Sequence, residues 1–303
     1  QLLLYLQSDW NINGTTYKTG TLVSYDLPSF LAGTPEIMTI YEPGDRESLG
    51  GVMTTRDFIV LATMENVQGR LKIIRPADGK WSIEEVTVPG IGTVGLAGSD
   101  DLSNDWFFTF SNPVTPTTLF HGDGKDVKPI RKQKDYFNAQ GVKVEQYEVA
   151  SKDGTMIPYF IVYPADMVND GTNPTLVYGY GGFNISITPS FSVSRLTWME
   201  MGGVLAVANL RGGGEYGETW HKSGTKQKKQ NVFDDFIAAA EWLIENKYTS
   251  SKKLAIQGGS NGGLLVGACM TQRPDLFGAC LPAVGVMDML RFHKFTAGRF
   301  WTD

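Results

Sequence analysis

A single serine stands inside a dense group of glycines in "AIQGGSNGGLLVG", residues 255–267. Gly258 to Gly262 satisfy the pattern G-x-S-x-G, and an apolar run, "KLAIQ", precedes them while a helix-like run, "GLLVGACMTQR", follows. Glycines at such a corner let a strand turn sharply into a helix without clashing with its neighbours. The serine oxygen is then exposed beside a helix N-terminus, whose partial positive charge favours an oxyanion. We therefore predict that Ser260 is a nucleophile; the alternative is a glycine-rich turn with an incidental serine.

Acyl transfer at a serine also needs hydrogen-bond donors for the oxyanion. The backbone N–H of Asn261, the residue after the serine, is one donor because of the way the turn is built. A second donor is expected from the loop after an earlier strand, and "VYGYGGFN", with Tyr178 and Tyr180, is such a loop. A tyrosine hydroxyl can donate there, although both tyrosines could instead be packing residues at a strand end.

A second glycine cluster, "RGGGEYG", has the form of a dinucleotide-binding motif. Gly212, Gly214 and Gly217 give G-x-G-x-x-G after the strand-like run "VLAVANL". The residues that follow, "ETWHKSGTKQKK", are polar and interrupted by Gly224, so no helix is expected where a pyrophosphate would need one. We therefore expect no nucleotide site here.

The region after residue 140 has the pattern of an α/β sheet. The unbroken apolar runs "PTLVYGY", "GVLAVANL", "KKLAIQGG" and "GACLPAVG" are typical of strands that are buried on both faces of a parallel sheet. A helical pattern with Asn231 as its expected cap, "NVFDDFIAAAEWLIENKY", lies between the second and third runs. Ser260 is thus predicted at a strand-to-helix corner of the sheet. The apolar stripe of the helix is predicted at Phe233, Phe236, Ile237, Ala240, Leu243 and Ile244.

The sequence before residue 140 predicts strands and no helices. Apolar runs such as "DFIVLATM" and "DWFFTF" are separated by Gly, Pro, Asn and Asp turns, with no helical pattern between them. One layout begins at Phe58 and again at Trp106, 48 residues later, and "QLLLYL" starts a third copy. A repeat of that length with four strands per unit is typical of a β-propeller blade, and a β-sandwich is the alternative. Fewer than three full blades fit, too few to close a ring.

Composition narrows the class of protein. At 303 residues and 42% hydrophobic content, two domains are expected. A net charge of -5 argues against nucleic acid, and the basic run at residues 222–229, "KSGTKQKK", is interpreted as a solvated face. Cys269 and Cys280 are expected to be buried free thiols in a reducing compartment, and not a disulfide. No apolar run approaches the ~18 residues of a membrane span.

The longest motifs closely resemble prolyl oligopeptidases, the cytosolic serine peptidases of clan S9. The matching runs are "YGYGGFNISITPSFSVSRL", "GGVLAVANLRGGGEYGETWHKSG", "GGSNGGLLV", "QRPDLFGA" and "VGVMDMLRFHKFT", in order from about Tyr147 to Trp301. The resemblance implies an α/β-hydrolase fold, with a doubly wound, mostly parallel sheet, preceded by part of a β-propeller. Residues 1–137 would be the later blades of a seven-bladed propeller, and residues 138–303 the catalytic domain.

The resemblance also implies roles for individual residues. Ser260 would be the nucleophile, and Tyr180 and Asn261 would donate to the oxyanion through a hydroxyl and a backbone N–H. Phe183, Val286 and Trp301 would form the apolar walls of a proline pocket, with Trp301 stacked on the ring. Proline has no N–H to recognise, so shape and aromatic contact must select it. The implied activity is cleavage of short proline-containing peptides after proline, by a cytoplasmic monomer that uses no cofactor and no metal.

The family's triad aspartate and histidine lie beyond residue 303, so we expect this piece alone to be inactive. The possible substitutes are His121, which is expected in a propeller turn, His221 and His293, and none is expected to act as the base. Three alternatives share much of the pattern: a peptide macrocyclase or transpeptidase of the same family, an inert hydrolase-fold binding protein, and a propeller interaction module. The last would leave the second half of the chain unexplained.

Overall fold

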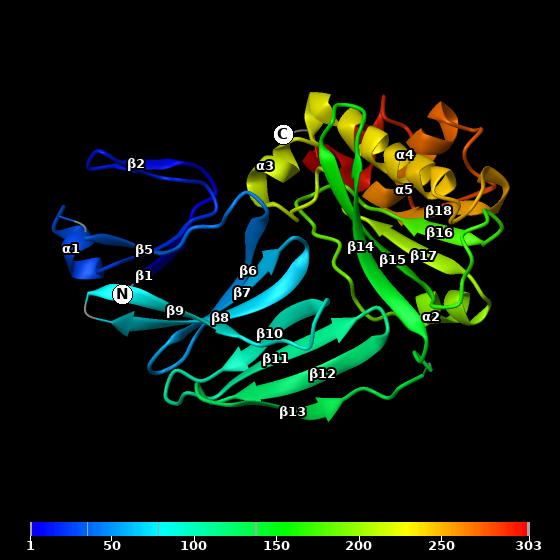
Figure 1. Cartoon of the computed structure of the whole chain (residues 1–303). Helices are drawn as coiled ribbons and strands as arrows, with labels where there is room; N and C mark the ends of the chain where they lie inside the picture. The colour runs from blue at the N-terminus through cyan, green and yellow to red at the C-terminus, as the bar shows by residue number, and fades with distance from the viewer. Residues whose placement is uncertain (1, 35, 78, 137, 302–303) are drawn as a thin grey trace. The chain divides into compact units, whose positions relative to one another are not determined.

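The computed structural model of the chain describes residues 2–34, 36–77, 79–136 and 138–301 (Figure 1). It forms two compact units. The first is the chain up to Tyr136 together with two short later segments, Thr188–Phe191 and Gly214–Thr219, and the remainder forms the second. The sequence predicted a single domain boundary, between residues 137 and 138, whereas the structure assigns both later segments to the first unit. Domain bounds at 1–137 and 138–303 therefore stay a prediction.

The first unit consists of antiparallel strands that follow one another along the chain (Figure 1). Two sheets have four strands each, in the orders β6-β7-β8-β9 and β10-β11-β12-β13, and a third has the order β1-β4-β5. Sheets of consecutive strands are typical of propeller blades, and the repeat predicted from Phe58 and Trp106 corresponds to β7 and β11. The strands are β1 (Leu2–Tyr5), the hairpin β2 (Trp10–Ile12) and β3 (Thr15–Tyr17), β4 (Leu22–Tyr25), β5 (Ile37–Tyr41), β6 (Glu47–Thr54), β7 (Ile59–Glu65), β8 (Gln68–Ala77), β9 (Lys80–Val86), β10 (Thr93–Ser99), β11 (Trp106–Asn112), β12 (Thr115–Gly122) and β13 (Val127–Lys132).

Strand β7 is buried on both faces, which explains its unbroken apolar sequence. Val60 and Ala62 pack into one core cluster with aromatic residues of β11. Ile59 and Leu61 point the other way and pack into a second cluster with apolar residues of β4 and β5. Successive side chains of a strand alternate between faces, so a strand between two sheets needs apolar residues at every position.

One short helix interrupts the first unit, where the strand pattern predicted none. Helix α1 (Leu27–Leu31) lies between β4 and β5. Oδ2 of Asp26 accepts a hydrogen bond from the N–H of Ser29 at 3.0 Å, and Pro28 stands in the first turn. An acidic cap followed by proline is a helix-start signal, so the start of α1 could have been predicted from "DLPSF".

The second unit is built on a six-stranded sheet with the order β14-β15-β17-β16-β18-β19 (Figure 1). The four strands from β16 to β19 pair in parallel, and β14 and β15 add an antiparallel edge. Strand β17 is buried at all five positions, as its apolar run predicts. The strands are β14 (Val142–Ala150), β15 (Met156–Pro164), β16 (Thr175–Tyr178), β17 (Val204–Ala208), β18 (Leu254–Gly259) and β19 (Ala279–Ala283).

Helices connect and cover the strands of this sheet. Helix α2 packs against β17, α4 against β14 and β15, and α5 against α4, β18 and β19. No helix in the described ranges is both long and apolar enough to cross a membrane. The helices are α2 (Val193–Glu200), α3 (Gly217–Lys222), α4 (Gln230–Glu245) and α5 (Asn261–Gln272), with the 3₁₀ helices η1 (Lys226–Lys228), η2 (Ser251–Lys253), η3 (Phe292–Lys294) and η4 (Thr296–Trp301).

Helix α4 differs from its prediction at its start and on its buried face. Lys229 occupies the cap position, and Asn231, the expected cap, lies inside the helix and donates to the carbonyl of Ser223 at 2.9 Å. Asp235 is fully buried because the guanidinium of Arg211 hydrogen-bonds it, which ties α4 to the loop after β17. Of the predicted stripe, Phe236, Ala240 and Leu243 are buried, whereas Phe233, Ile237 and Ile244 are only partly covered.

Candidate active site

Ser260 occupies the sharp turn between β18 and α5. Its φ of 56° and ψ of -117° lie outside the regions that non-glycine residues prefer, and its side chain is exposed. The N–H of Ser260 donates to the carbonyl of Ala283 at 2.9 Å, and its own carbonyl accepts from the N–H of Gly263 at 2.9 Å and of Leu264 at 3.2 Å. Backbone hydrogen bonds on both sides therefore hold the strained turn at which Ser260 is exposed.

The surrounding glycines differ in how much the turn needs them. A Cβ at Gly258 would lie 2.3 Å from the carbonyl oxygen of Gly262, and a Cβ at Gly262 would lie 2.6 Å from that of Gly179. A Cβ at Gly259 would meet only the Cβ and the carbonyl oxygen of Ala283, both at 4.0 Å. Steric exclusion thus applies to Gly258 and Gly262, the two fixed glycines of the motif.

Gly258→Ala should destabilise the protein by about 1–3 kcal/mol, because the added methyl meets backbone that cannot move without opening the turn. Gly259→Ala is the matched control and should keep the wild-type melting temperature. Thermal unfolding of the full-length variants measures both effects. Equal melting temperatures for the two variants would contradict the steric argument.

The loop with the two tyrosines lies beside this turn. Strand β16 pairs in parallel with β18, so both strands end at the same edge of the sheet. A Cβ at Gly262 would lie 3.6 Å from Cδ2 of Tyr180, which puts that ring next to the turn. The ring of Tyr178 lies instead under the guanidinium of Arg195, at 4.6 Å. The geometry therefore favours Tyr180 over Tyr178 as the hydroxyl donor.

Hydrogen bonds from the Asn261 side chain connect the turn to this loop. Nδ2 of Asn261 donates to the carbonyl of Tyr180 at 2.6 Å, and its Oδ1 accepts from Nζ of Lys229 at 3.0 Å. The same Nζ donates to the carbonyl of Gly181 at 2.8 Å. The interpretation of residues 222–229 as a solvated face is therefore wrong for Lys229. A lysine that closes a basic run and begins a helix carries no sequence signal for this contact.

Two of the three predicted pocket residues lie together. The rings of Phe183 and Trp301 are 5.9 Å apart between centroids and meet edge to face at 69°. Phe183 has a φ of 55°, and both side chains are about half exposed, at 51% and 42%. Val286 is half-buried in the loop after β19, and its place beside the two rings stays a prediction.

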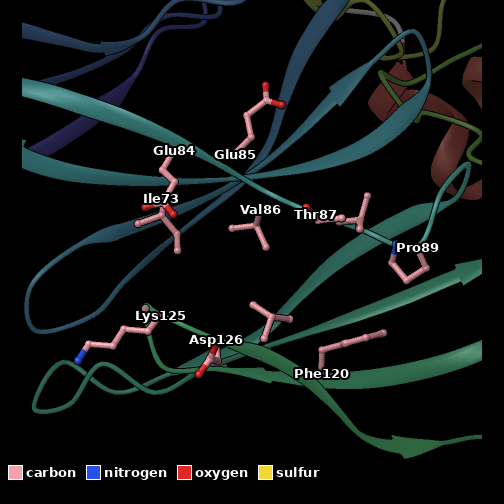
Figure 2. Close-up of a pocket in the computed structure, with 12 residues that line it drawn as sticks. Ile73, Glu84, Glu85, Val86, Thr87, Pro89, Phe120, Lys125 and Asp126 are labelled. Atoms are coloured by element: carbon pink, nitrogen blue, oxygen red, sulfur yellow. The ribbon is translucent and has the colours of Figure 1, made fainter.

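A cavity of about 500 Å³ lies elsewhere, within the first unit between strands of its two four-stranded sheets. Figure 2 shows Val86 and Phe120 in its apolar lining, together with the charged residues Glu84 and Lys125. None of the 12 lining residues is a serine, cysteine or histidine. The lining therefore holds no serine–histidine pair of the kind that the predicted acyl transfer would use.

Two of the three histidines hydrogen-bond other residues, and the third is exposed. His121 lies in β12, not in a turn as predicted, and its Nε2 is 2.7 Å from Oδ1 of Asp105. Nδ1 of His221 is 2.7 Å from the carbonyl oxygen of Gly212, and His293 is exposed in η3. None of them hydrogen-bonds Ser260 in the described part of the chain. Among the described residues, the predicted nucleophile therefore has no histidine as a hydrogen-bonded base.

The second glycine cluster does lead into a helix, contrary to the prediction. Helix α3 starts at Gly217, the third glycine of the motif, and runs for six residues. Glu218 stands in its first turn, where its carboxylate opposes the binding of a phosphate. A short polar helix gives a weak apolar period, which is why the pattern concealed it. The absence of a nucleotide site stays a prediction. It is now supported by the negative charge of Glu218, and no longer by the expected lack of a helix.

Comparisons with known proteins match both halves of the chain. A family model described as "Prolyl oligopeptidase family" matches residues 189–303, and one described as "Prolyl oligopeptidase, N-terminal beta-propeller domain" matches residues 18–134. Prolyl endopeptidase of Elizabethkingia miricola is 50% identical over 221 residues, which cover 72% of this chain and 31% of that protein.

Solved structures agree with these matches. That of a post-proline cleaving enzyme from Rickettsia typhi superposes with a TM-score of 0.92 at 36% identity, over 99% of this chain and 44% of that one. Prolyl oligopeptidase B from Galerina marginata, bound to a 35mer hydrolysis and macrocyclization substrate, gives 0.85 at 36% identity, over 93% and 40%. The chain thus spans less than half the length of these relatives. Because the two models describe the two domains of one family and match in the same order along the sequence, the predicted fold class is confirmed and the chain belongs to the prolyl oligopeptidase family.

Proposed function

We propose that the complete protein is a serine endopeptidase that cleaves short peptides on the carboxyl side of proline. The observation that carries the proposal is the strained, exposed Ser260 at the start of α5, beside the Tyr180 loop. The names of the relatives from Elizabethkingia miricola and Rickettsia typhi, a prolyl endopeptidase and a post-proline cleaving enzyme, support the bond specificity.

The proposed reaction passes through an acyl-enzyme. Oγ of Ser260 attacks the scissile carbonyl while a base takes its proton, and the N–H of Asn261 and the hydroxyl of Tyr180 donate to the oxyanion. Collapse of the tetrahedral intermediate breaks the C–N bond, and the amine leaves with the proton from the base. Water then attacks the ester, and release of the acid restores Ser260. We propose that the base and its orienting carboxylate belong to the rest of the complete protein, so residues 1–303 alone are inactive.

Two experiments on the full-length protein test the proposal against its alternatives. A fluorophosphonate probe should label Ser260; failure to label would favour an inert binding protein. Masses of the products from a linear proline-containing peptide should show hydrolysis, with addition of water to the substrate. Product masses that sum to the substrate mass, with a cyclic product one water lighter than the hydrolysed acid, would show macrocyclisation, in which the substrate's own amine intercepts the acyl-enzyme. The substrate of the Galerina marginata structure is described for both outcomes.

Trp301→Ala should narrow the preference for proline over alanine substrates. If Trp301 stacks on the proline ring beside Phe183, its loss removes an apolar contact of roughly 1–3 kcal/mol, and kcat/KM for a proline peptide should fall about 10- to 200-fold. A matched alanine peptide fills less of the pocket and should lose less. Phe300→Ala removes the neighbouring ring, which is 69% exposed, and should leave kcat/KM for both substrates unchanged. An equal fall for both peptides would mean that Trp301 supports the fold and not the pocket.

We further propose that the complete protein acts as a cytoplasmic monomer on peptides, without a cofactor or metal. Cys269 and Cys280 are both free thiols, which supports a reducing compartment. Cys269 is fully buried, so it packs as a small apolar side chain. Sedimentation of the full-length protein would measure the oligomeric state directly.

A further inference from the structure

Lys229 immediately precedes α4, and its ammonium faces the loop that carries Tyr180. It donates to the carbonyl of Gly181 at 2.8 Å and to Oδ1 of Asn261 at 3.0 Å. The other end of the same amide group, Nδ2, donates to the carbonyl of Tyr180 at 2.6 Å. These three hydrogen bonds tie two consecutive carbonyls of the loop to the first residue of α5.

The backbone after Tyr180 needs such support. Gly181 has a φ of +62° and is followed by Gly182, so two residues without a Cβ separate Tyr180 from the next side chain. Phe183 and Asn184 then have φ values of 55° and 56°, which are unfavourable for residues other than glycine. A strained stretch of this kind persists only where surrounding contacts over-determine it.

Helix α4 also limits the position of the loop by steric contact. A Cβ at Gly181 would lie 2.3 Å from Cγ1 of Val232, and a Cβ at Gly179 would lie 2.7 Å from Cε2 of Phe236. Val232 and Phe236 follow Lys229 at helical spacing, on the side of α4 that faces the loop. Packing thus sets how closely the loop approaches, and the hydrogen bonds orient its peptide planes.

The partners of the Lys229 ammonium are neutral. No carboxylate lies within ion-pair distance of it among the residues that the structure describes. Burial lowers the pKa of Lys229 to about 8, so the cation still predominates at neutral pH although its burial is costly. A cation held beside the oxyanion donors also favours negative charge that develops there.

We propose that Lys229 is a positioning residue of the oxyanion site: by holding Gly181 and Asn261 together, it fixes Tyr180 in the orientation from which its hydroxyl donates to the oxyanion. The inference rests on the proposed function, because it takes the Tyr180 hydroxyl as a donor. Lys229 acts through Tyr180 and touches neither the nucleophile nor the reacting carbonyl.

Lys229→Met in the full-length protein keeps the length of the side chain and removes the ammonium. We expect kcat for a proline peptide to fall about 10- to 100-fold with KM within about 3-fold, because small displacements of a donor reduce rate more than binding. Lys228→Met alters the adjacent exposed lysine and should behave as wild type. An unchanged kcat for Lys229→Met would overturn the proposal. If the methionine variant does not fold, Lys229→Leu, which also lacks an N–H donor, replaces it with the same expected result.

A double-mutant cycle separates positioning from a merely structural role. Tyr180→Phe should lower kcat about 10²- to 10³-fold in the wild type but less than about 10-fold in Lys229→Met, since a displaced hydroxyl has little left to lose. Asn261→Ala keeps the backbone N–H, and adding it to Lys229→Met should lower kcat by no more than about 3-fold. Independent, multiplying effects in both cycles would overturn the proposal.

The rate of fluorophosphonate labelling at Ser260 distinguishes failure of the inference from failure of the proposed function. If the wild type is labelled but does not cleave proline peptides, the proposed specificity is wrong. The inference about Lys229 is then tested by the same two double-mutant cycles, with the labelling rate in place of kcat. If the wild type cleaves and Lys229→Met matches it in both assays, only the inference is wrong. A wild type that is not labelled would overturn both.

Discussion

Ser260→Ala in the full-length protein should abolish cleavage of proline-containing peptides and leave the fold unchanged. In the proposed mechanism the hydroxyl oxygen forms the covalent bond to the acyl group, and an enzyme that lacks one triad member retains only about 10³- to 10⁴-fold catalysis over water. The methyl group of alanine occupies the same exposed position at the turn, so the melting temperature should stay within a degree or two of wild type. The measurement is kcat with a fluorogenic proline peptide, together with thermal unfolding.

Ser250→Ala is the matched control for this variant. It removes a serine hydroxyl shortly before β18 that makes no capping hydrogen bond, so activity should be unchanged. Residual activity above a few percent in Ser260→Ala, after contaminating wild-type enzyme has been excluded, would show that the nucleophile is another residue. If the melting temperature falls together with the activity, unfolding would account for the lost activity. The fluorophosphonate labelling experiment then decides the role of Ser260.

Features of the site that depend on neighbouring residues in the sequence were predictable. The corner at Ser260 follows from local steric rules, because a strand can enter a helix so abruptly only where Gly258 and Gly262 lack side chains. Strand β17 follows from an apolar run that only a strand covered on both faces would carry. The order of these elements along the chain is enough to indicate a doubly wound sheet.

Features that depend on contacts between distant segments were not predictable. Asp235 reads as a solvent-facing acid in a helix, yet the guanidinium of Arg211 allows it to be fully buried. Lys229 reads as the last charge of an exposed basic run, yet Gly181 and Asn261 give its ammonium partners inside the protein. In both cases the partner lies on another element, so periodicity along one segment contains no trace of the contact.

The choice between the two tyrosines also needed the structure. Both follow the same strand, two residues apart, and both have a hydroxyl of the right kind. Arg195 covers the ring of Tyr178, whereas the ring of Tyr180 lies against the position of Gly262 in the turn. The family resemblance and the geometry favour the same residue on independent grounds.

Tyr180→Phe should therefore lower kcat about 10²- to 10³-fold, the usual loss for one oxyanion donor, with KM changed little. The ring is kept, so its packing against the turn is preserved and only the hydrogen bond to the developing oxyanion is lost. Tyr178→Phe is the matched control, and it should retain most of the wild-type kcat because its ring still lies under Arg195. Steady-state kinetics of the two full-length variants on one proline peptide measure the difference. If Tyr178→Phe is the damaging change, the donor has been assigned to the wrong tyrosine. The proposed role of Lys229 fails with it, because that residue acts on Tyr180 through the Gly181 carbonyl and the Asn261 side chain.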